Sequence, residues 1–555
     1  MNTTASKRKC EISAQTSIHW FRHGQRLHDN PALLDALDGC DTLYPVFIFD
    51  GQVAGTDTAG YNRWRFLLES LEDLDRQFQK HGGRLYVFKG DPVVVLKNLF
   101  KEWGVTKLTI EQDPEPIWQD RDCRVKSLCE DEGVTCVEKI SHTLWNPHVI
   151  IKLNGGLPPV TYMLFNQVAR STGKPDRPVG DPDFTKVKLP VSDNHSEQFG
   201  VPSLADMGVK PECKEQDDRI NKWMGGETKA LELLESRLKL EAEAFEKNIF
   251  LPNQHQVDLI GSPMSLSAYL RFGCVSVRKF YWGIQDTYVK LKGKDAPLSA
   301  TAQLMWREYF YTMSLNNINY NKVENNPICL KINWIKDDKK LERWLQGETG
   351  FPWIDAIMKQ LRAEGWVHQA ARHAVACFLT RGDLWLSWED GLKVFYKYLL
   401  DADWSVCAGN WMWVASSAFE DVLQCPKCFC PVRYGIRMDP KGAYIRRYLP
   451  VLKEMPLRYL FQPWKAPLEV QEAAGCIVGK DYPSPMVDHM LAAKVNRKKM
   501  MDIKEIMKTD TGKQYCAPVN QTEVGQFAFL QELTDPSNTC LSDVTCQALN
   551  VQECM

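Results

Sequence analysis

The segment DADWSVCAGNWMWV, residues 401–414, places two carboxylates, one thiol and three indoles close together. Carboxylates exchange protons or bind cations, and a thiol is a nucleophile or a weak proton donor. An indole can lose one electron to a strong oxidant. Asp401 and Asp403 stand just before a helical stretch, where they either cap the helix or hold a bound group. The segment therefore indicates acid–base or redox chemistry.

Two further tryptophans, Trp385 and Trp388, precede this segment in LWLSWEDGLKVFYKYLL. A spacing of three residues puts two side chains on one face of a helix, so their rings are expected to be neighbours. The whole chain holds 18 tryptophans, and a large core uses such residues for packing alone. The spacing leaves both interpretations open, core packing and electron transfer.

The elements that position these residues begin with alternating strands and helices over residues 15–150. Short apolar runs followed by helices that often end at Gly predict βαβ units and a doubly wound parallel sheet, although the region has no GxGxxG. Residues 151–215 are rich in Pro, Gly and Asp and indicate a connector. Helical periodicity predicts a large all-α domain over residues 216–505, and a polar composition marks residues 506–555 as a C-terminal tail.

Length and composition limit the classes of function. A chain of 555 residues exceeds the ~250–300 residues of a single core, so at least two domains are expected. No apolar run reaches the ~20 residues that cross a bilayer, and the N-terminus lacks the apolar run of a secretory signal. We therefore expect an intracellular protein whose 18 cysteines are mostly reduced. The net charge of −2 gives no overall attraction to nucleic acid.

Seven motifs, in the correct order along nearly the whole chain, resemble those of the photolyase/cryptochrome family. They are IHWFRHGQRLHDNPAL, GGETKALELL, SLSAYLRFGCVSVRKFY, QLMWREYFYTM, TGFPWIDAIMKQLRAEGWVHQAARHAVACFLTRGDLW, DADWSVCAGNWMWVASSAF and DPKGAYIRRYLPVL. The resemblance implies a photolyase-type α/β domain and a helical domain that holds one noncovalent FAD. It leaves open whether the α/β domain also carries an antenna pigment.

The resemblance also implies which side chains surround the FAD. The pyrophosphate needs hydroxyl, backbone N–H and guanidinium donors. The segment GSPMSLSAYL departs from the family's usual T-S-x-L-S-P-Y-L, so Ser267 matches best and Ser262 least. An isolated Ser or Arg would more simply be a cap or a solvated charge. Matched position by position, the cofactor-binding residues are Arg237, Ser262, Ser265, Ser267, Gln303, Arg307, Gln369, Arg372, Asp401, Asp403 and Cys407.

Three of these residues have specific implied roles. Asp403 is expected to accept a hydrogen bond from the edge of the flavin ring, and Asp401 to pair with Arg372 beneath it, because a buried carboxylate needs a partner. Cys407 matches the position that faces flavin N5, where repair photolyases and mammalian-type cryptochromes usually carry Asn and plant cryptochromes Asp. A thiol there resembles the insect, Drosophila-like (type 1) light-sensing class. A neutral thiol is a poor proton donor, so it should leave N5 unprotonated.

The tryptophans match the family's electron-transfer chain. Trp411 is implied to lie next to the flavin, Trp388 to be intermediate and Trp334 to be nearer the surface. Trp385 is a candidate fourth member. Trp404 and Trp413 have no such match and are expected in the core.

The implied function is a blue-light photoreceptor of the circadian clock, not an enzyme. It would signal through flavin photoreduction and release of the C-terminal tail, and then bind a timeless-like clock protein and an F-box ubiquitin-ligase component. Cytoplasm and nucleus are the implied locations, with no membrane and little or no nucleic acid binding. Two alternatives remain, a light-dependent DNA repair photolyase and a light-independent transcriptional repressor.

The repair alternative is weakened by one position. Lesion repair in (6-4) photolyases uses W-x-H-H-x-x-x-H, whereas this chain has GWVHQAARH with Gln369 at the first lesion-acting histidine. Glutamine cannot be a general acid. The repressor alternative is disfavoured by Cys407 and by the short tail.

Three smaller motifs complete the expectations. EVGQFAFLQEL in the tail resembles the C-terminal helix of the Drosophila-like class, with Phe527 and Phe529 as two of its aromatic trio. CPKCFC, residues 425–430, has the spacing of half a zinc site, but no second pair lies nearby, so no metal is predicted. KVNRKK, residues 494–499, either aids nuclear import or ends a solvated helix.

Overall fold

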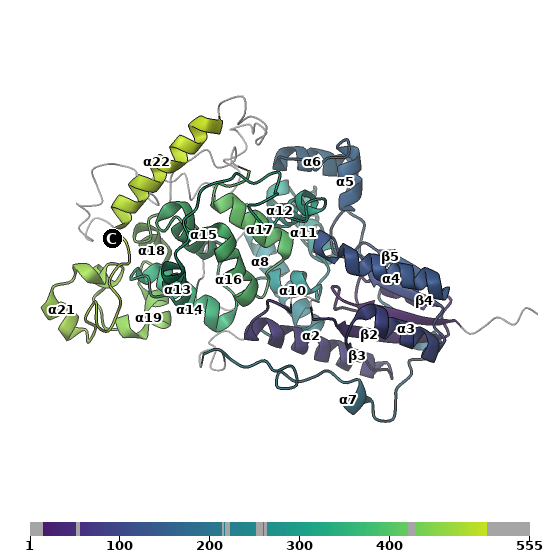
Figure 1. The fold of residues 1–555 in the computed structure, drawn as a ribbon. Coiled ribbons are helices and arrows are strands. Elements are labelled where there is room, and N and C mark those ends of the chain that lie inside the picture. The colour runs from purple at the N-terminus through teal and green to yellow at the C-terminus, as the bar shows by residue number, and fades with distance from the viewer. Residues whose placement is uncertain are drawn as a thin grey trace, which may run out of the picture.

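The computed structural model describes residues 15–51, 56–213, 216, 223–250, 259, 264–419 and 429–507. Figure 1 shows a sheet covered by helices, joined to a larger part made of helices alone. No helix within these ranges is both long and apolar enough to span a membrane.

Five parallel strands form the sheet, in the order β3-β2-β1-β4-β5. In the central strand, Ile18 lies opposite Tyr44 on one side and Leu108 on the other. The predicted doubly wound parallel sheet is therefore confirmed. The strands are β1 (Thr16–Phe21), β2 (Thr42–Phe49), β3 (Tyr86–Lys89), β4 (Lys107–Glu111) and β5 (Thr135–Lys139).

Helices cover both faces of the sheet because successive strand residues point to opposite sides. Ile18 and Trp20 of β1 belong to the apolar cluster that includes α3 and α4, whereas Phe21 belongs to the cluster that includes α1 and α2. Local signals set the helix ends. The Asp91 carboxylate caps α3, which ends at Gly104 in the left-handed conformation. The four helices are α1 (Pro31–Leu37), α2 (Tyr61–Lys80), α3 (Pro92–Trp103) and α4 (Gln119–Glu132).

The predicted connector contains helices that the sequence did not indicate. Tyr162 of α6 stacks on Trp306 with ring centroids 4.0 Å apart, which fixes this segment on the helical part. The Pro- and Gly-rich composition of this region did not indicate α6, because a helix this short is stabilised mainly by tertiary packing of its apolar face. The helices of this region are α5 (Pro147–Leu153), α6 (Tyr162–Ser171) and α7 (His195–Gln198).

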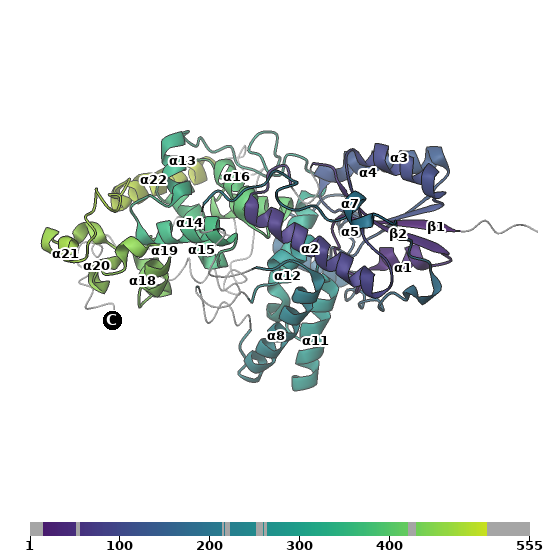
Figure 2. The ribbon, with the colours of Figure 1, turned by 90° about the horizontal axis from the view of Figure 1, so that it is seen from below.

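The remaining helices build the helical part, as predicted. Figure 2 shows α2 extending from the sheet toward α16, and the N–H of Gly60, just before α2, donates to Lys397 O at the end of α16. The helices are α8 (Glu227–Glu246), α10 (Ser267–Phe272), α11 (Val277–Lys292), α12 (Leu298–Ser314), α13 (Asp338–Gln346), α14 (Pro352–Glu364), α15 (Gln369–Cys377), α16 (Trp388–Tyr398), α17 (Trp404–Val414), α18 (Arg433–Met438), α19 (Ala443–Tyr448), α20 (Leu457–Leu460), α21 (Leu468–Ala473) and α22 (His489–Met507).

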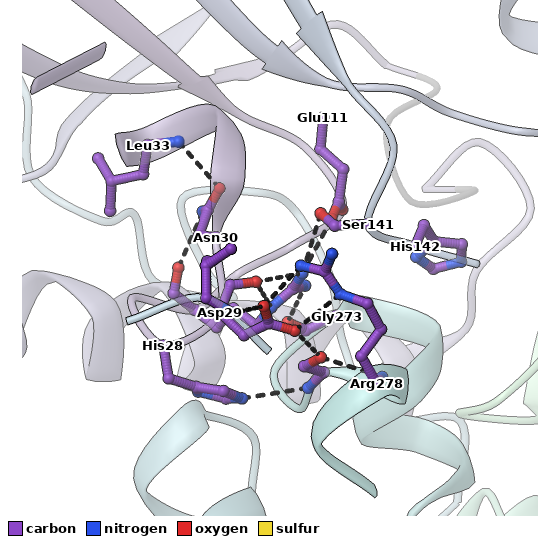
Figure 3. A network of polar contacts seen from close by, with 12 residues as sticks. His28, Asp29, Asn30, Leu33, Glu111, Ser141, His142, Gly273 and Arg278 are labelled. Atoms are coloured by element: carbon purple, nitrogen blue, oxygen red, sulfur yellow. Dashed lines mark hydrogen bonds and ion pairs between the residues drawn. The ribbon is translucent and has the colours of Figure 1, made fainter. Parts of the chain in front are cut away.

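A buried polar network joins the two parts (Figure 3). The carboxylate of Asp29, from the segment after β1, accepts from Arg278 Nε of α11 at 3.1 Å. Arg26 donates to Gly273 O at 3.0 Å and to Glu111 Oε1 of β4 at 3.0 Å. Each charge thus has a partner from another element, as buried charges require. This network explains why the motif after β1 is so polar although it is buried.

Candidate functional site

The site is built around the turn that precedes α17. The carbonyl oxygen of Ala402, between the two aspartates, accepts from Arg63 Nη2 and from Arg271 Nε, each at 3.0 Å. Arg63 belongs to α2 and Arg271 to α10, so the turn is held from both parts of the fold. Sequence analysis missed both arginines, because neither lies near this turn along the chain.

Asp401 and Arg372 form a two-point ion pair. Arg372 Nη1 and Nη2 donate to the two carboxylate oxygens at 2.9 and 2.8 Å, while its Nε donates to Val367 O at 2.9 Å. The Arg372 side chain is 16% exposed and the Asp401 side chain 5%. Such a bidentate pair fixes the plane of the guanidinium, and it joins α15 to the turn before α17.

Asp403, unlike Asp401, contacts α10 and α12. Its Oδ1 accepts from the hydroxyl of Tyr311 at 2.6 Å and lies 3.3 Å from Arg271 Nε. Burial raises the pKa of Asp403 to about 6. Asp403 occupies the N-cap position of α17 but makes no capping hydrogen bond with its side chain, so the simple capping role does not apply. Its predicted contact with a flavin edge stays a prediction. In the structure, Oδ1 of this carboxylate contacts Arg271 of α10 and Tyr311 of α12.

Cys407 lies one turn into α17, where its N–H donates to Asp403 O at 3.0 Å. Burial, with a smaller contribution from the Asp401 carboxylate, raises the pKa of the Cys407 thiol to about 12. The thiol is therefore neutral at every physiological pH. A neutral thiol is a weak hydrogen-bond donor and gives up its proton reluctantly.

We expect Cys407 to resist alkylation in the folded protein. At pH 8 a thiol with a pKa of about 12 has roughly 1,000-fold less thiolate than an ordinary one. Labelling by iodoacetamide, followed by peptide mass spectrometry, should show Cys123, which is exposed, reacting far faster than Cys407. The raised pKa also means that stability falls as pH rises from about 9 to 12, since only the unfolded thiol ionises there. Equal labelling rates would contradict the neutral, buried thiol.

Arg237 and Gln303 line a small recess between α8, α11 and α12. Arg237 is buried, and its Nε and Nη2 donate to Glu241 Oε1 at 2.8 and 2.6 Å. A guanidinium and an amide at one recess suit phosphate oxygens or sugar hydroxyls. Arg307 is turned away from it: Nη1 donates to His142 O at 2.9 Å. The structure therefore places Gln303, but not Arg307, at the recess.

Ser265 and Ser267 lie together before and at the start of α10. Ser265 Oγ donates to Ser267 Oγ at 2.9 Å, and Trp366 Nε1 donates to Ser267 Oγ at 3.4 Å. The guanidinium of Arg372 lies 6.0 Å from the Trp366 ring. Trp366, which the sequence did not single out, thus links the serine pair to the ion pair of Arg372.

Gln369 begins α15 beside His373. Its Nε2 lies 3.1 Å from His373 Nε2 and donates to Asn410 Oδ1 at 3.4 Å. Burial, with the nearby charge of Arg372, lowers the pKa of His373 to about 3. His373 is therefore neutral and cannot act as a general acid near pH 7.

Trp411 is buried in α17, where Gly391 of α16 faces its ring. Trp388, one turn before Gly391, is fully buried and contacts the Cys329 thiol. Trp344, missed by sequence analysis, approaches Trp411 edge-on with centroids 6.3 Å apart. Helices α16 and α17 therefore pack two of the predicted electron carriers into one interior.

Trp385 and Trp388 are not on one helix, contrary to the sequence prediction. Ser387 caps α16, which begins at Trp388. Trp385 instead has a positive φ of 56°, and its carbonyl oxygen accepts from the N–H of Ile335 at 3.0 Å. The turn packs the Trp385 ring against half-buried Trp334, with centroids 4.8 Å apart. The two outer tryptophans are therefore a contact pair.

Gly391→Ala should disturb this packing. The added methyl carbon would lie 2.2 Å from Cη2 of Trp411 and 2.6 Å from Leu379 Cδ2. We expect the free energy of unfolding to fall by about 1–3 kcal/mol and the near-ultraviolet circular dichroism to change. Gly283→Ala in α11 is the control, because its methyl group meets only the flexible end of Leu238. Unchanged denaturant unfolding of Gly391→Ala would disprove the tight contact.

Several predicted positions lie outside the described residues: Ser262, Phe527, Phe529 and Cys425 to Cys428 of the CPKCFC motif. Trp413, expected in the core, is buried and stacks on Trp306. Trp404 is buried as well. Within the described ranges, no group of three or more His, Cys, Asp or Glu side chains is placed to bind a metal ion.

Comparison with known proteins covers both parts of the fold. Residues 17–183 match a family model described as DNA photolyase, and residues 300–502 match one described as the FAD binding domain of DNA photolyase. Cryptochrome-1 of Aedes aegypti is 51% identical over 536 residues, which are 93% of this chain and 98% of that protein. Cryptochrome-1 of Macaca fascicularis is 47% identical over 96% of this chain and 90% of that protein.

Solved structures show the same fold. A bacterial class III photolyase from Agrobacterium tumefaciens matches 91% of this chain and 100% of its own, with a TM-score of 0.74 and 27% identity. The cryptochrome of Synechocystis sp. PCC6803 matches 87% of this chain and 99% of its own, with a TM-score of 0.75 and 23% identity.

Proposed function

Because this chain belongs to the photolyase/cryptochrome family and its cofactor is FAD, we propose that it is a blue-light photoreceptor of the circadian clock. One observation carries the proposal. Cys407 is neutral and buried beside the Arg372–Asp401 pair. It shares α17 with Trp411, the first member of a tryptophan series that ends in the half-buried Trp334. This arrangement can move an electron while withholding a proton. Cys407 also favours the Drosophila-like class within the family.

The residues present fit FAD. Arg237 and Gln303 offer donors at the recess, and Ser265 and Ser267 offer hydroxyls. The bidentate Arg372–Asp401 pair holds a planar guanidinium, which suits contact with a planar ring. When bound, FAD supplies light absorption and accepts an electron. In this mechanism Trp411 donates an electron, Trp388 and the outer pair replace it in turn, and Cys407 keeps its proton on Sγ.

We propose that the protein signals and does not repair DNA. Two positions that would act on a lesion are Gln369, which has no acidic proton, and His373, whose pKa of about 3 keeps it neutral. The remaining alternatives are a repair photolyase and a light-independent repressor. Light-driven reversal of an ultraviolet lesion by purified protein would establish the first alternative.

The signalling output is proposed by family resemblance. Reduction in blue light would release the C-terminal tail, with Phe527 and Phe529 as its docking aromatics. The freed surface would bind a timeless-like clock protein and an F-box ubiquitin-ligase component, in cytoplasm and nucleus. Co-precipitation of these partners in light but not in darkness would support this output, and equal recovery in both would contradict it.

The deciding experiment is the absorption spectrum of the purified protein in air, before and after blue light. We expect the bands of oxidised flavin to fall in light and to return in darkness. Flavin bands that light leaves unchanged would contradict the photoreceptor and favour the light-independent repressor.

A further inference from the structure

The outer tryptophan pair, Trp334 and Trp385, packs against α22, the last described helix. Figure 1 shows this helix along one edge of the helical part. Lys499 Nζ of α22 is 4.5 Å from the centroid of the Trp385 ring. Next to it, Met500 is buried in one apolar cluster with Leu330, Ile332 and Trp385. Lys499 and Met500 of α22 therefore contact Trp385, at the end of the tryptophan series.

The first turns of α22 are held by other contacts. His489 Nδ1 and Asp383 Oδ1 are 2.6 Å apart in a buried ion pair. Asn496 Nδ2 donates to Gly382 O at 3.1 Å. Both contacts reach the π-helical turn Phe378–Gly382 and the residue after it. Lys499 and Met500 follow these anchors, so the two halves of α22 rest on different supports.

A positive charge formed on the tryptophan pair would stay there. Trp385 Nε1 donates to the backbone carbonyl oxygen of Asn333 at 3.0 Å, and a peptide oxygen is too weak a base to remove the indole proton. Trp334 Nε1 is buried and has no acceptor among the described residues. Within the same part of the chain, Lys499 forms no ion pair, so its charge on this ring is not neutralised by a carboxylate.

We propose that Lys499 makes α22 sensitive to the charge on the Trp334–Trp385 pair. This inference rests on the proposed function, which supplies a flavin as the one-electron oxidant. Trp411 first gives one electron to the flavin, and Trp388 replaces it. The Trp334–Trp385 pair then gives one electron to the oxidised Trp388. No covalent bond breaks and no proton moves. The attraction between ammonium and neutral ring then becomes repulsion between two positive charges. The half of α22 after Asn496 loosens, while His489 and Asn496 keep the first half in place.

The test compares four full-length, FAD-loaded proteins: wild type, Lys499→Met, Lys499→Arg and Lys498→Met. Met keeps the length of the side chain without its charge, and Arg keeps the charge. Lys498 is exposed on the same helix and is not placed over the ring, which makes it the matched control. Hydrogen–deuterium exchange of the peptides covering residues 489–507 is recorded in darkness and in blue light, together with the flavin absorption of each sample.

We expect blue light to speed amide exchange after Asn496 by about ten-fold in the wild type, in Lys499→Arg and in Lys498→Met. Lys499→Met should lose this effect while its flavin still bleaches. Bleaching without faster exchange in the wild type, or equal acceleration in Lys499→Met, would overturn the inference. A wild-type flavin that does not bleach would instead refute the proposed function.

A second arm tests Lys499 without light or flavin chemistry. Azide radicals produced by pulse radiolysis oxidise tryptophan in darkness, and Trp385→Phe identifies the signal of the pair. Removing the Lys499 charge should increase the yield of oxidised pair about five-fold, whereas Lys499→Arg and Lys498→Met should match the wild type. Equal yields in wild type and Lys499→Met would refute the electrostatic contact.

Discussion

Trp411→Phe is expected to lower the rate of light-driven flavin reduction by about 100-fold or more. A benzyl ring is much harder to oxidise than an indole, and each ~1.4 kcal/mol added to a barrier slows the step about ten-fold. Trp411 is 2% exposed and lies on the helix of Cys407, and the proposed series assigns it the position next to the flavin. The measurement is the rate of flavin bleaching under a fixed dose of blue light.

Trp413→Phe is the matched control for loss of aromatic volume. It lies two residues further along α17, is 4% exposed and stacks on Trp306 with centroids 4.6 Å apart. Both substitutions should lower stability by a similar amount, but only Trp411→Phe should stop the bleaching. If both slow the reaction equally, the effect comes from packing and Trp411 is not the donor.

Asp401→Leu is expected to release the FAD and to lower the free energy of unfolding by about 3 kcal/mol, since it leaves a largely buried guanidinium without its partner. The affected group is Arg372, whose two Nη atoms both donate to this carboxylate. Chemical denaturation would measure the stability, and the flavin-to-protein absorbance ratio would measure retention of the cofactor.

A second substitution separates the two effects. Arg372→Leu combined with Asp401→Leu removes both charges, so much of the stability should return, because apolar pairs often replace buried ion pairs without loss. The flavin should still be lost. Lys393→Gln, which breaks an ion pair whose lysine is 75% exposed, should change neither quantity. Normal flavin retention in the double variant would show that the pair is structural only.

Much of the fold was predictable because its signals are local. Short apolar runs that alternate with helices predicted the doubly wound sheet, and Asp91 with Gly104 shows how single residues mark the ends of a helix. The motif order indicated the cofactor, and the resemblance placed Arg372 opposite Asp401. These inferences need only neighbouring residues or a known pattern.

Other features depended on residues that lie far apart in the chain. The Trp385 spacing predicted a helical neighbour of Trp388, but the cap at Ser387 and the bridge to Ile335 gave Trp385 a different partner. The resemblance matched both Gln303 and Arg307 to the cofactor, yet Arg307 donates to the backbone carbonyl of His142 from the α/β part.

The sequence by itself determined the two-part architecture, the FAD family and the identity of the redox-capable residues. Only the tertiary structure decided that Arg63 and Arg271 meet at Ala402, that burial keeps the Cys407 thiol neutral and that Lys499 lies over Trp385. Periodicity reports which face of an element is buried. It carries no information about which distant element covers that face, because chain closure and packing of the whole fold choose the partner.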